Sequence, residues 1–337
     1  MTAASSVRLL VPAGVDDPRR VSGGNVYDRR VREGLRRRGW TVVVSEVADR
    51  DAAAAALRAA PAGALVLVDG LAAGWAADEV VAAARRLRIA VLAHMVVAAF
   101  PDAGPVAVAA ERRVLGAAVR VVATSRWTAD ELVRRGLVDE DRVAVAAPGA
   151  APAEPARPWR DGDLLCVGVV APHKGQDLLL DALDRTGAAE WTCRIVGPTD
   201  RHPDFAAGIA HRAAAIGPRV SLTGALHGAA LADAYRRAAL LVAPSRVESA
   251  GMAIADAQAR GIPILATAVG GIPGTVAAGG AVLVRPDDAA ALADALHAWM
   301  TDPSLRARLR AEAARARSGL PTWEDTAAQL AHALEET

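Results

Sequence analysis

Short apolar runs alternate with longer runs of helical pattern along most of this 337-residue chain, and this alternation limits the fold more than any other feature. The apolar runs are nearly continuous, as in parallel strands that are buried on both faces. Strand–helix–strand alternation predicts parallel α/β sheets with right-handed crossovers. In the first part of the chain we expect strands at residues 7–14, 41–47, 64–70, 89–95, 119–125 and 141–149, and helices at 25–38, 51–60, 78–87, 106–117 and 128–135.

A proline-rich segment at residues 147–163 interrupts the alternation and is predicted to be a linker, because it has no apolar periodicity. The alternation then restarts. It therefore predicts two doubly wound α/β domains, with a ligand cleft at the carboxyl ends of both sheets. In the second part we expect strands at 164–170, 191–197, 219–224, 240–245, 262–267 and 281–284, and helices at 176–183, 204–216, 229–238, 250–260, 287–315 and 322–335.

Composition excludes several other classes of protein. With 53% hydrophobic residues the chain is too apolar to be disordered, and with only 3% aromatic residues its core must be filled by aliphatic side chains and alanine. The balance of 39 basic and 38 acidic residues argues against a nucleic-acid binder. Residues 1–14 lack the pattern of a signal peptide, and no run reaches the roughly 18 apolar residues of a membrane span. Cys166 and Cys193 lie in apolar runs, which predicts reduced core residues in a cytoplasmic protein.

The sequence GVVAPHKG at residues 168–175 follows the first strand of the second domain and contains Lys174, the only lysine in the chain. A lysine carries a compact cation on a flexible stem, which suits the binding of a phosphate at the end of a strand. Because every other basic residue except histidine is arginine, we interpret Lys174 as a functional cation rather than a solvated surface residue.

A second segment, PSRVESAGMAIADAQARGIPILATAVGGIPGTV at residues 244–276, carries two acidic residues around a predicted helix start. Small residues at 249–251 leave backbone N–H groups accessible to a phosphate. Asp256 follows on the helix, where its carboxylate could accept hydrogen bonds from the vicinal hydroxyls of a ribose. Glu248 precedes the helix and could reach a sugar hydroxyl or a developing cationic centre. The alternative is that one acid stabilises the helix dipole and the other is solvated.

Two adjacent glycines, Gly23 and Gly24, stand between the first expected strand and the first helix. Such a pair lets backbone N–H groups approach an anion. The dinucleotide-binding pattern G-x-G-x-x-G is absent at this place, which argues against a nicotinamide dehydrogenase. A plain turn with a helix cap is the alternative interpretation.

These motifs resemble those of retaining, nucleotide-sugar-dependent glycosyltransferases of the GT-B fold, in the large family-four group. That family carries G-R-x-x-x-x-K-G after the first strand of its second domain, and P-S-x-x-E-G-x-G-x-x-x-x-E-A-x-A-x-G-x-P-V-V-A-T-x-x-G-G-x-P-E further on. The resemblance covers nearly the whole chain, including residues 123–150 and the closing segment 322–334. It implies two facing Rossmann-like domains with a cleft between them. Residues 1–155 would form the acceptor side, residues 160–318 the donor side, and a helix at about 322–337 would cross back onto the first domain.

The resemblance also implies roles for single residues. Lys174 would bind the donor diphosphate, and Glu248 would face the hydroxyls of the donor sugar. His94 matches a family histidine near the transferred sugar, although a structural histidine at a strand end is the alternative. The further donor-binding residues implied are Gly23 and Gly24 at the diphosphate, His173, the segment Ser249, Ala250, Gly251 and Met252 at sugar and phosphate, and Asp256 at the ribose.

Three positions depart from the family pattern. Val169 replaces the arginine that follows the glycine, so one diphosphate cation is missing, and His173 or Arg246 is expected to compensate. Asp256 replaces the second glutamate and is one methylene shorter. Gly274 stands where the family has its last glutamate. We expect these changes to affect donor affinity more than the fold.

The expected reaction is the transfer of a hexosyl group from a nucleoside-diphosphate sugar to a hydroxyl acceptor, with retention of configuration and no cofactor. Uridine is favoured as the donor base and guanosine is the alternative; the acceptor cannot be inferred. No metal site is predicted, because the acidic pairs at 16–17 and 287–288 resemble turn or cap residues. A non-catalytic nucleotide-sugar sensor and a sugar-nucleotide epimerase are the competing functions. Six arginines at positions 29, 30, 32, 36, 37 and 38 are expected to form a solvated helix face, and peripheral contact with an anionic membrane is the less favoured alternative.

Overall fold

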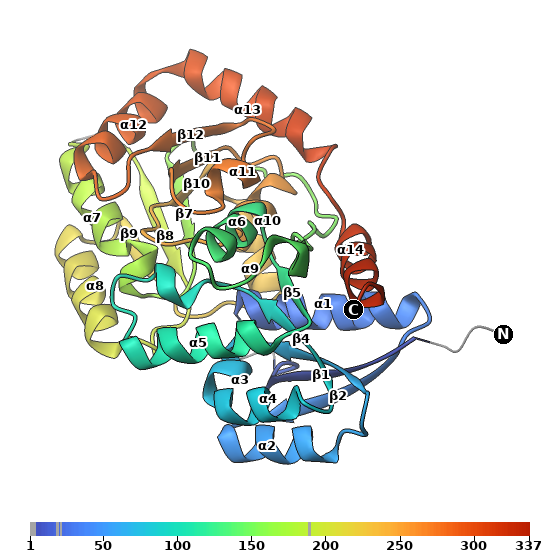
Figure 1. The fold of residues 1–337 in the computed structure, drawn as a ribbon. Coiled ribbons are helices and arrows are strands. Elements are labelled where there is room, and N and C mark those ends of the chain that lie inside the picture. The colour runs from blue at the N-terminus through green and yellow to red at the C-terminus, as the bar shows by residue number, and fades with distance from the viewer. Residues whose placement is uncertain (1–4, 18–19, 21, 188–189) are drawn as a thin grey trace. The chain divides into compact units, whose positions relative to one another are not determined.

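The computed structural model describes residues 5–17, 20, 22–187 and 190–337. Its contacts divide the chain into two compact units (Figure 1): unit 1 comprises Met1–Gly149 and Pro321–Thr337, and unit 2 comprises Ala150–Leu320. Within the described residues each unit contains one six-stranded sheet, and all strand pairs are parallel. The α/β architecture predicted from the alternation is therefore confirmed for both halves.

Unit 1 has the strand order β2-β1-β3-β4-β5-β6, so the direction of the crossovers reverses between β1 and β3. One face of the sheet is covered by α2, α4, α5 and α6, whose alanines, valines and leucines form a single buried cluster with the strands. The strands are β1 (Ser6–Pro12), β2 (Thr41–Val47), β3 (Leu65–Asp69), β4 (Arg88–Ala93), β5 (Arg120–Ala123) and β6 (Val143–Val145); the helices are α1 (Gly23–Arg37), α2 (Arg50–Ala59), α3 (Gly70–Trp75), α4 (Ala77–Ala83), α5 (Pro105–Ala117), α6 (Arg126–Arg134) and α14 (Trp323–Glu335).

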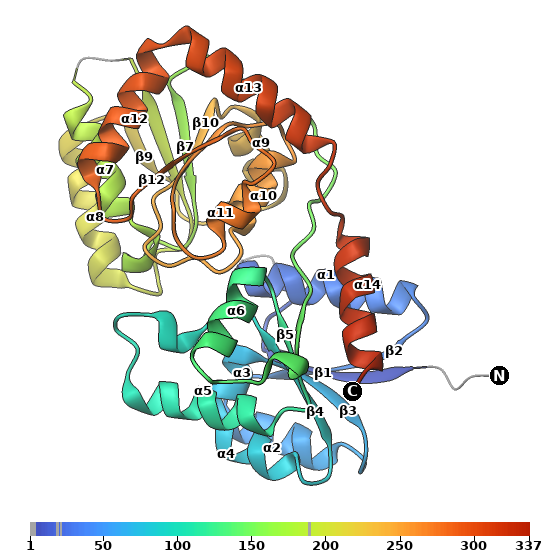
Figure 2. The same ribbon diagram turned by 45° about the horizontal axis from the view of Figure 1, so that its top comes forward.

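Unit 2 has the strand order β12-β11-β10-β7-β8-β9, which is the order of dinucleotide-binding sheets, with the reversal between β7 and β10. Helices α7, α8 and α12 bury one face of the sheet, and α9, α10 and α11 bury the other (Figure 2). The strands are β7 (Asp163–Val167), β8 (Thr192–Val196), β9 (Val220–Leu222), β10 (Leu240–Ala243), β11 (Ile264–Thr267) and β12 (Ala281–Val284); the helices are α7 (Gln176–Arg185), α8 (Pro203–Ile216), α9 (Gly228–Arg236), α10 (Met252–Gln258), α11 (Ile272–Thr275), α12 (Ala289–Thr301) and α13 (Pro303–Arg317).

The closing helix α14 packs against α1 within unit 1. The two helices approach closely because Gly34 faces Ala327, where a Cβ on the glycine would lie 2.3 Å from the alanine Cβ. The Tyr27 hydroxyl donates a hydrogen bond to the Ala146 carbonyl (2.6 Å), and Thr326 Oγ1 donates to the Ala147 carbonyl (2.7 Å). These bonds attach both helices to the segment that leaves β6.

Most expected elements are present, but several details differ. Two short helices, α3 and α11, were not expected, and α3 forms because the Asp69 side chain accepts hydrogen bonds from the N–H groups of Leu71 and Ala72. The helical part expected at 287–315 consists of two helices, since Pro303 begins α13 and Asp302 caps it. Helix α10 begins at Met252, two residues later than expected. The cleft between the two halves stays a prediction.

Other features of the sequence are confirmed. Cys166 and Cys193 are free and buried, and the core consists mainly of aliphatic side chains and alanine. No helix in the described part of the chain has the length and apolarity to cross a bilayer.

Candidate functional site

The sequence-predicted residues gather at the carboxyl ends of the central strands, where the strand order reverses in each sheet. In unit 2 these are the segments after β7 and β10, which carry Lys174 and Glu248 respectively. In unit 1 they are the segment after β1, which leads to Gly23 and Gly24 at the start of α1, and the segment after β4, which begins with His94. Ligands of open α/β sheets bind at such reversal points.

In unit 2 the segments after β7 and β10 are joined through their backbones. The His173 carbonyl accepts hydrogen bonds from the N–H groups of Arg246 (2.8 Å) and Val247 (3.3 Å). Gly175 has φ +67°, and a Cβ there would lie 2.0 Å from the Pro244 carbonyl oxygen. The close approach therefore requires glycine at 175, immediately after the lysine.

Lys174 and Glu248 form an ion pair, with 2.6 Å between Nζ and Oε2. Both side chains are largely buried, with 22% and 17% of their surface exposed. The other carboxylate oxygen of Glu248 accepts a hydrogen bond from the Gly251 N–H (3.2 Å). Burial alone would raise the pKa of Glu248, but the charge and hydrogen bond of Lys174 and the bond from Gly251 together lower it below its usual value. Glu248 is thus a carboxylate at neutral pH, and only one of the three N–H donors of Lys174 is used by it.

Gly270 holds the Glu248 backbone in place, and sequence reasoning gave this residue no role. It has φ +55°, and a Cβ at this position would lie 1.8 Å from the Glu248 carbonyl oxygen. The same carbonyl accepts a hydrogen bond from the N–H of Gly271 (2.9 Å). The paired glycines after β11 were visible in the sequence. Only the sheet order shows that they contact the segment after β10, which carries Glu248.

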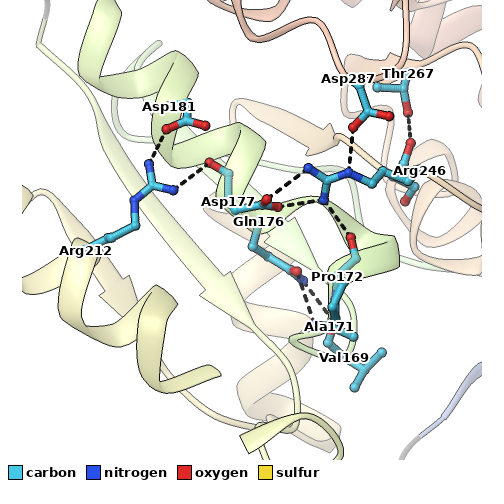
Figure 3. Close-up of polar contacts among 11 residues, drawn as sticks. Val169, Ala171, Pro172, Gln176, Asp177, Asp181, Arg212, Arg246, Thr267 and Asp287 are labelled. Atoms are coloured by element: carbon cyan, nitrogen blue, oxygen red, sulfur yellow. Dashed lines mark hydrogen bonds and ion pairs between the residues drawn. The ribbon is translucent and has the colours of Figure 1, made fainter. Parts of the chain in front are cut away.

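Arg246, one of the two residues expected to compensate for the missing diphosphate cation, is held by several contacts within unit 2, and its role toward a diphosphate stays a prediction. Its guanidinium donates to both carboxylate oxygens of Asp177 (2.8 and 2.9 Å), to Asp287 (2.6 Å) and to the Pro172 carbonyl (2.7 Å), as Figure 3 shows. These contacts fasten the segment after β10 to the start of α7. His173, the other expected substitute, lies 6.4 Å from the ring of His202.

Gln176 fixes the turn that contains Val169. This glutamine is fully buried, its Nε2 donates to the Val169 carbonyl (2.9 Å), and its Oε1 accepts from the Ala171 N–H (3.4 Å), as drawn in Figure 3. The turn is thus held by a neutral amide. Lys174 brings an ammonium to Glu248, and the charge of His173 also lowers the pKa of Glu248.

The remaining donor-side residues lie along the start of α10. Ser249 and Gly251 are buried, and Ala250 and Met252 are partly exposed. The Ala250 carbonyl accepts a hydrogen bond from Thr275 Oγ1 (2.9 Å). Their predicted contacts with sugar and phosphate stay predictions.

Asp256 lies one turn into α10, and its carboxylate is 3.8 Å from the Arg260 guanidinium, with 43% of the side chain exposed. Its predicted hydrogen bonds to a ribose stay a prediction.

In unit 1, His94 follows β4 and lies between two buried aspartates. Its Nε2 is 3.1 Å from Asp28 Oδ1 and 3.1 Å from Asp69 Oδ2. Asp28 comes from α1 and Asp69 from the end of β3. Sequence reasoning missed both aspartates, although Asp28 stands on the apolar face of its helix beside Val31 and Leu35, where a charged residue requires a partner.

Gly23 and Gly24 form the first turn of α1 rather than a loop before it, and Ser22 is the N-cap, accepting a hydrogen bond from the Asn25 N–H. The expectation that the helix begins at Asn25 was therefore two residues late. A Cβ on Gly24 would make only an ordinary contact of 3.5 Å with the His94 ring. The fold of the described residues does not demand glycine at 24.

Asp28, Asp69 and His94 also place one ligand atom each within 4.8 Å of one another, a spacing at which a metal ion could be held. The acidic pairs considered in the sequence do not form such a group: Asp16 pairs with Arg32 (2.7 Å), and Asp288 caps α12 through the Ala291 N–H (2.9 Å). The metal independence of the reaction stays a prediction.

Comparison with known proteins gives these two sites a context. Residues 161–302 match the model of the family described as glycosyl transferases group 1. D-inositol 3-phosphate glycosyltransferase of Frankia alni is 34% identical over 241 residues, which is 64% of this chain and 58% of that protein. The enzyme of the same name from Streptomyces coelicolor is 33% identical over 259 residues, 66% of this chain and 56% of that protein. The chain thus matches less than two thirds of the length of these relatives.

Solved structures show the fold. Sucrose-phosphate synthase from Thermosynechococcus elongatus superposes with a TM-score of 0.83 at 20% identity over 98% of both chains. The Anabaena protein HepE, solved with UDP-glucose, superposes with a TM-score of 0.79 at 17% identity over 98% of this chain and all of that one. The chain therefore has the GT-B fold. Residues 161–302, which make up most of unit 2, are similar to the glycosyl transferases group 1 family, and both Lys174 and Glu248 lie in this matched range.

Proposed function

We propose that this protein is a glycosyltransferase that takes a hexosyl group from a nucleoside-diphosphate sugar bound to unit 2. The observation that carries the proposal is the Lys174–Glu248 pair at the strand reversal of a glycosyl transferases group 1 domain. When the glycosidic bond breaks, negative charge grows on the leaving diphosphate and positive charge on the sugar. An ammonium beside a carboxylate supplies a partner for each of these charges.

The protein would use these groups as follows. Two N–H donors of Lys174 remain to contact the diphosphate while the third stays on Glu248. The carboxylate of Glu248 would accept hydrogen bonds from the hydroxyls of the donor sugar. Both groups are held before the reaction by the backbone contacts of Gly175 and Gly270, so little reorganisation is needed. We further propose that the reaction retains configuration and needs no metal.

The relatives support a first choice of donor and acceptor to test. HepE was solved with UDP-glucose, which supports UDP-sugars as the favoured donors and leaves GDP-sugars as the alternative. The names of the curated relatives make an inositol phosphate the first acceptor to test. Such substrates and two free buried cysteines fit an enzyme of the cytoplasm.

A two-stage experiment tests this proposal. Thermal unfolding is first measured with UDP-, GDP- and TDP-sugars, and a true donor at many times its dissociation constant raises the midpoint. The stabilising donor is then incubated with D-inositol 3-phosphate and the products are separated. A glycosylated inositol phosphate is the expected product. Stabilisation without any turnover would indicate a sensor, and nucleotide release without a transfer product would indicate an epimerase-like reaction; either result, or no stabilisation at all, contradicts the proposal.

A further inference from the structure

The carboxylate of Glu248 is held at both of its oxygens. Oε2 is 2.6 Å from Lys174 Nζ, and Oε1 accepts a hydrogen bond from the Gly251 N–H (3.2 Å). The ammonium of a lysine is carried on a flexible stem, whereas an N–H group is part of the backbone. The direction of the Gly251 N–H is therefore what can fix the plane of this carboxylate.

The peptide that carries this N–H precedes helix α10. The helix begins at Met252, one residue after Gly251, and Gly251 has φ +68°. Glycine permits a wide range of backbone angles, so α10 alone does not fix the peptide between Ala250 and Gly251. A trans peptide is planar, and its C=O and N–H point in opposite directions. A hydrogen bond to the Ala250 carbonyl consequently sets the direction of the Gly251 N–H.

Thr275, the last residue of α11, provides that hydrogen bond. Its Oγ1 is 2.9 Å from the Ala250 carbonyl oxygen and 3.1 Å from that of Gly271. The Gly271 carbonyl already accepts the N–H of Thr275 (3.0 Å), whereas within the described residues no second donor reaches the Ala250 carbonyl. The single hydroxyl hydrogen is therefore assigned to Ala250. The buried amide of Gln258 donates to the Thr275 carbonyl (3.1 Å), which ties the backbone of Thr275 to α10.

We propose that Thr275 is a positioning residue that orients the carboxylate of Glu248. Its hydroxyl holds the Ala250 carbonyl, and the same peptide then directs the Gly251 N–H at Oε1 of Glu248. The other oxygen, Oε2, is thereby presented to the ammonium of Lys174. Thr275 acts on the reaction only through these groups. The consequence for glycosyl transfer rests on the proposed function, but the orientation of the carboxylate does not.

The single lysine provides a test that needs no substrate. Full-length protein grown with lysine labelled at its terminal carbon and nitrogen gives one side-chain signal, that of Lys174. Glu248→Gln defines the shift of this signal when the ion pair is lost. Thr275→Val and Thr275→Ala, which lack the hydroxyl, should each shift it in the same direction by a smaller amount. Thr275→Ser keeps the hydroxyl and should leave the signal at its wild-type position.

Thr186→Val is the matched control for these variants. The buried Thr186 hydroxyl also donates to a carbonyl within unit 2, that of Leu183 (2.7 Å), but at the end of α7 that is distant from Lys174. The control should leave the Lys174 signal unchanged.

Transfer kinetics provide a second measurement. With the stabilising donor, Thr275→Val should lower kcat by about tenfold to a hundredfold, the scale for a small misplacement of a group at the reaction centre. KM should change much less, because the orientation of Glu248 matters most when charge develops on the sugar. Thr275→Ser should restore kcat.

Each outcome decides the question. An unchanged Lys174 signal in the folded variants that lack the hydroxyl overturns the proposal. A signal of Thr275→Ser or Thr186→Val that is shifted as far as that of Thr275→Val also overturns it. If Thr275→Val fails to fold, Thr275→Ala and Thr275→Ser still decide. The expected shifts without any transfer by the wild type would contradict the proposed function and support the orientation of Glu248 by Thr275.

Discussion

The two units place their polar clusters at equivalent points of their sheets but give them different charges. In unit 2 one ammonium faces one carboxylate, and each side chain keeps about a fifth of its surface exposed. In unit 1 one imidazole faces two carboxylates that are almost completely buried. In both units the polar cluster lies where the strand order of the sheet reverses. The side chains at the strand ends decide what each place can bind.

This difference assigns different tasks to the two clusters. Lys174 keeps donors that a diphosphate can use, so the unit 2 cluster can take part directly in binding and catalysis. The aspartates of unit 1 are almost completely buried, and each contacts His94. The predictions below test this distinction, from the largest expected effect to the smallest.

Removal of either member of the unit 2 pair should have the largest effect. Lys174→Ala and Glu248→Gln are expected to lower the transfer rate at least about a hundredfold, because each removes a group that stabilises charge in the transition state. Lys174→Arg tests the shape of the cation, since a planar guanidinium does not replace a compact ammonium beside Glu248. Steady-state transfer assays with the stabilising donor provide the measurement.

Arg212→Ala is the matched control, because Arg212 forms an exposed pair with Asp181 in the same unit. It should keep nearly the wild-type rate. Wild-type transfer by both Lys174→Ala and Glu248→Gln would refute the role of the pair.

Gly270→Ala should destabilise unit 2 next most strongly. The new Cβ would meet the Glu248 carbonyl in a backbone conformation that alanine rarely adopts, which costs about 1–3 kcal/mol or more. Chemical denaturation measures the loss. Gly208→Ala is the control: Gly208 lies in α8 with open space around it, so alanine there should hold or raise stability. Equal effects of the two substitutions on stability would show that Gly270 does not hold the backbone of Glu248 in place.

Arg246→Ala should lower the free energy of unfolding by about 1–2 kcal/mol, because it leaves Asp177 and Asp287 without their charged partner. Donor affinity, measured by calorimetry, should change little. Arg285→Ala removes a far more exposed arginine and should cost less than about 0.5 kcal/mol. A large loss of donor affinity with unchanged stability in Arg246→Ala would instead make Arg246 a ligand of the diphosphate.

The two clusters should respond to pH in opposite directions. The pKa of Glu248 is lowered on folding, so its contribution to stability is present above its ordinary pKa of 4.5 and is lost as the pH falls through the lowered value. The pKa of His94 is raised, so its contribution is complete below 6.5 and is lost as the pH rises toward about 10. Denaturation of wild type, Glu248→Gln and His94→Gln at several pH values tests this. The difference in unfolding free energy between wild type and Glu248→Gln should shrink in acid, and the difference between wild type and His94→Gln should shrink in base. The same trend for both variants contradicts the comparison.

Gly24→Ala is expected to have the smallest effect on stability, a gain of up to about 1 kcal/mol, because alanine suits a helix better than glycine and fits beside His94. Transfer should nevertheless fall if the diphosphate approaches this turn. Higher stability together with an unchanged rate would remove Gly24 from the donor site. Unfolding and transfer are measured on the same preparation.

The sequence predicted the sheets well because continuous apolar runs are a local signal, and β3 and β11 are indeed buried along their whole length. It predicted Lys174 and Glu248 as functional residues, yet not that they contact each other, because 74 positions separate them and only the neighbouring places of β7 and β10 bring them together. Asp28 and Asp69 were missed for the same reason. The short helices α3 and α11 were missed because each spans only four to six residues and contains glycine, so tertiary contacts and caps decide their formation.

The lone lysine allows the most direct test of the central claim. Protein grown with lysine labelled at the terminal carbon and nitrogen contains one labelled side chain, Lys174. Its NMR signal is followed while the stabilising nucleoside-diphosphate sugar is added. We predict a saturable shift of this signal with the same dissociation constant that calorimetry gives. Binding of the nucleotide sugar in calorimetry with no change in the Lys174 signal would contradict the claim that this ammonium holds the diphosphate.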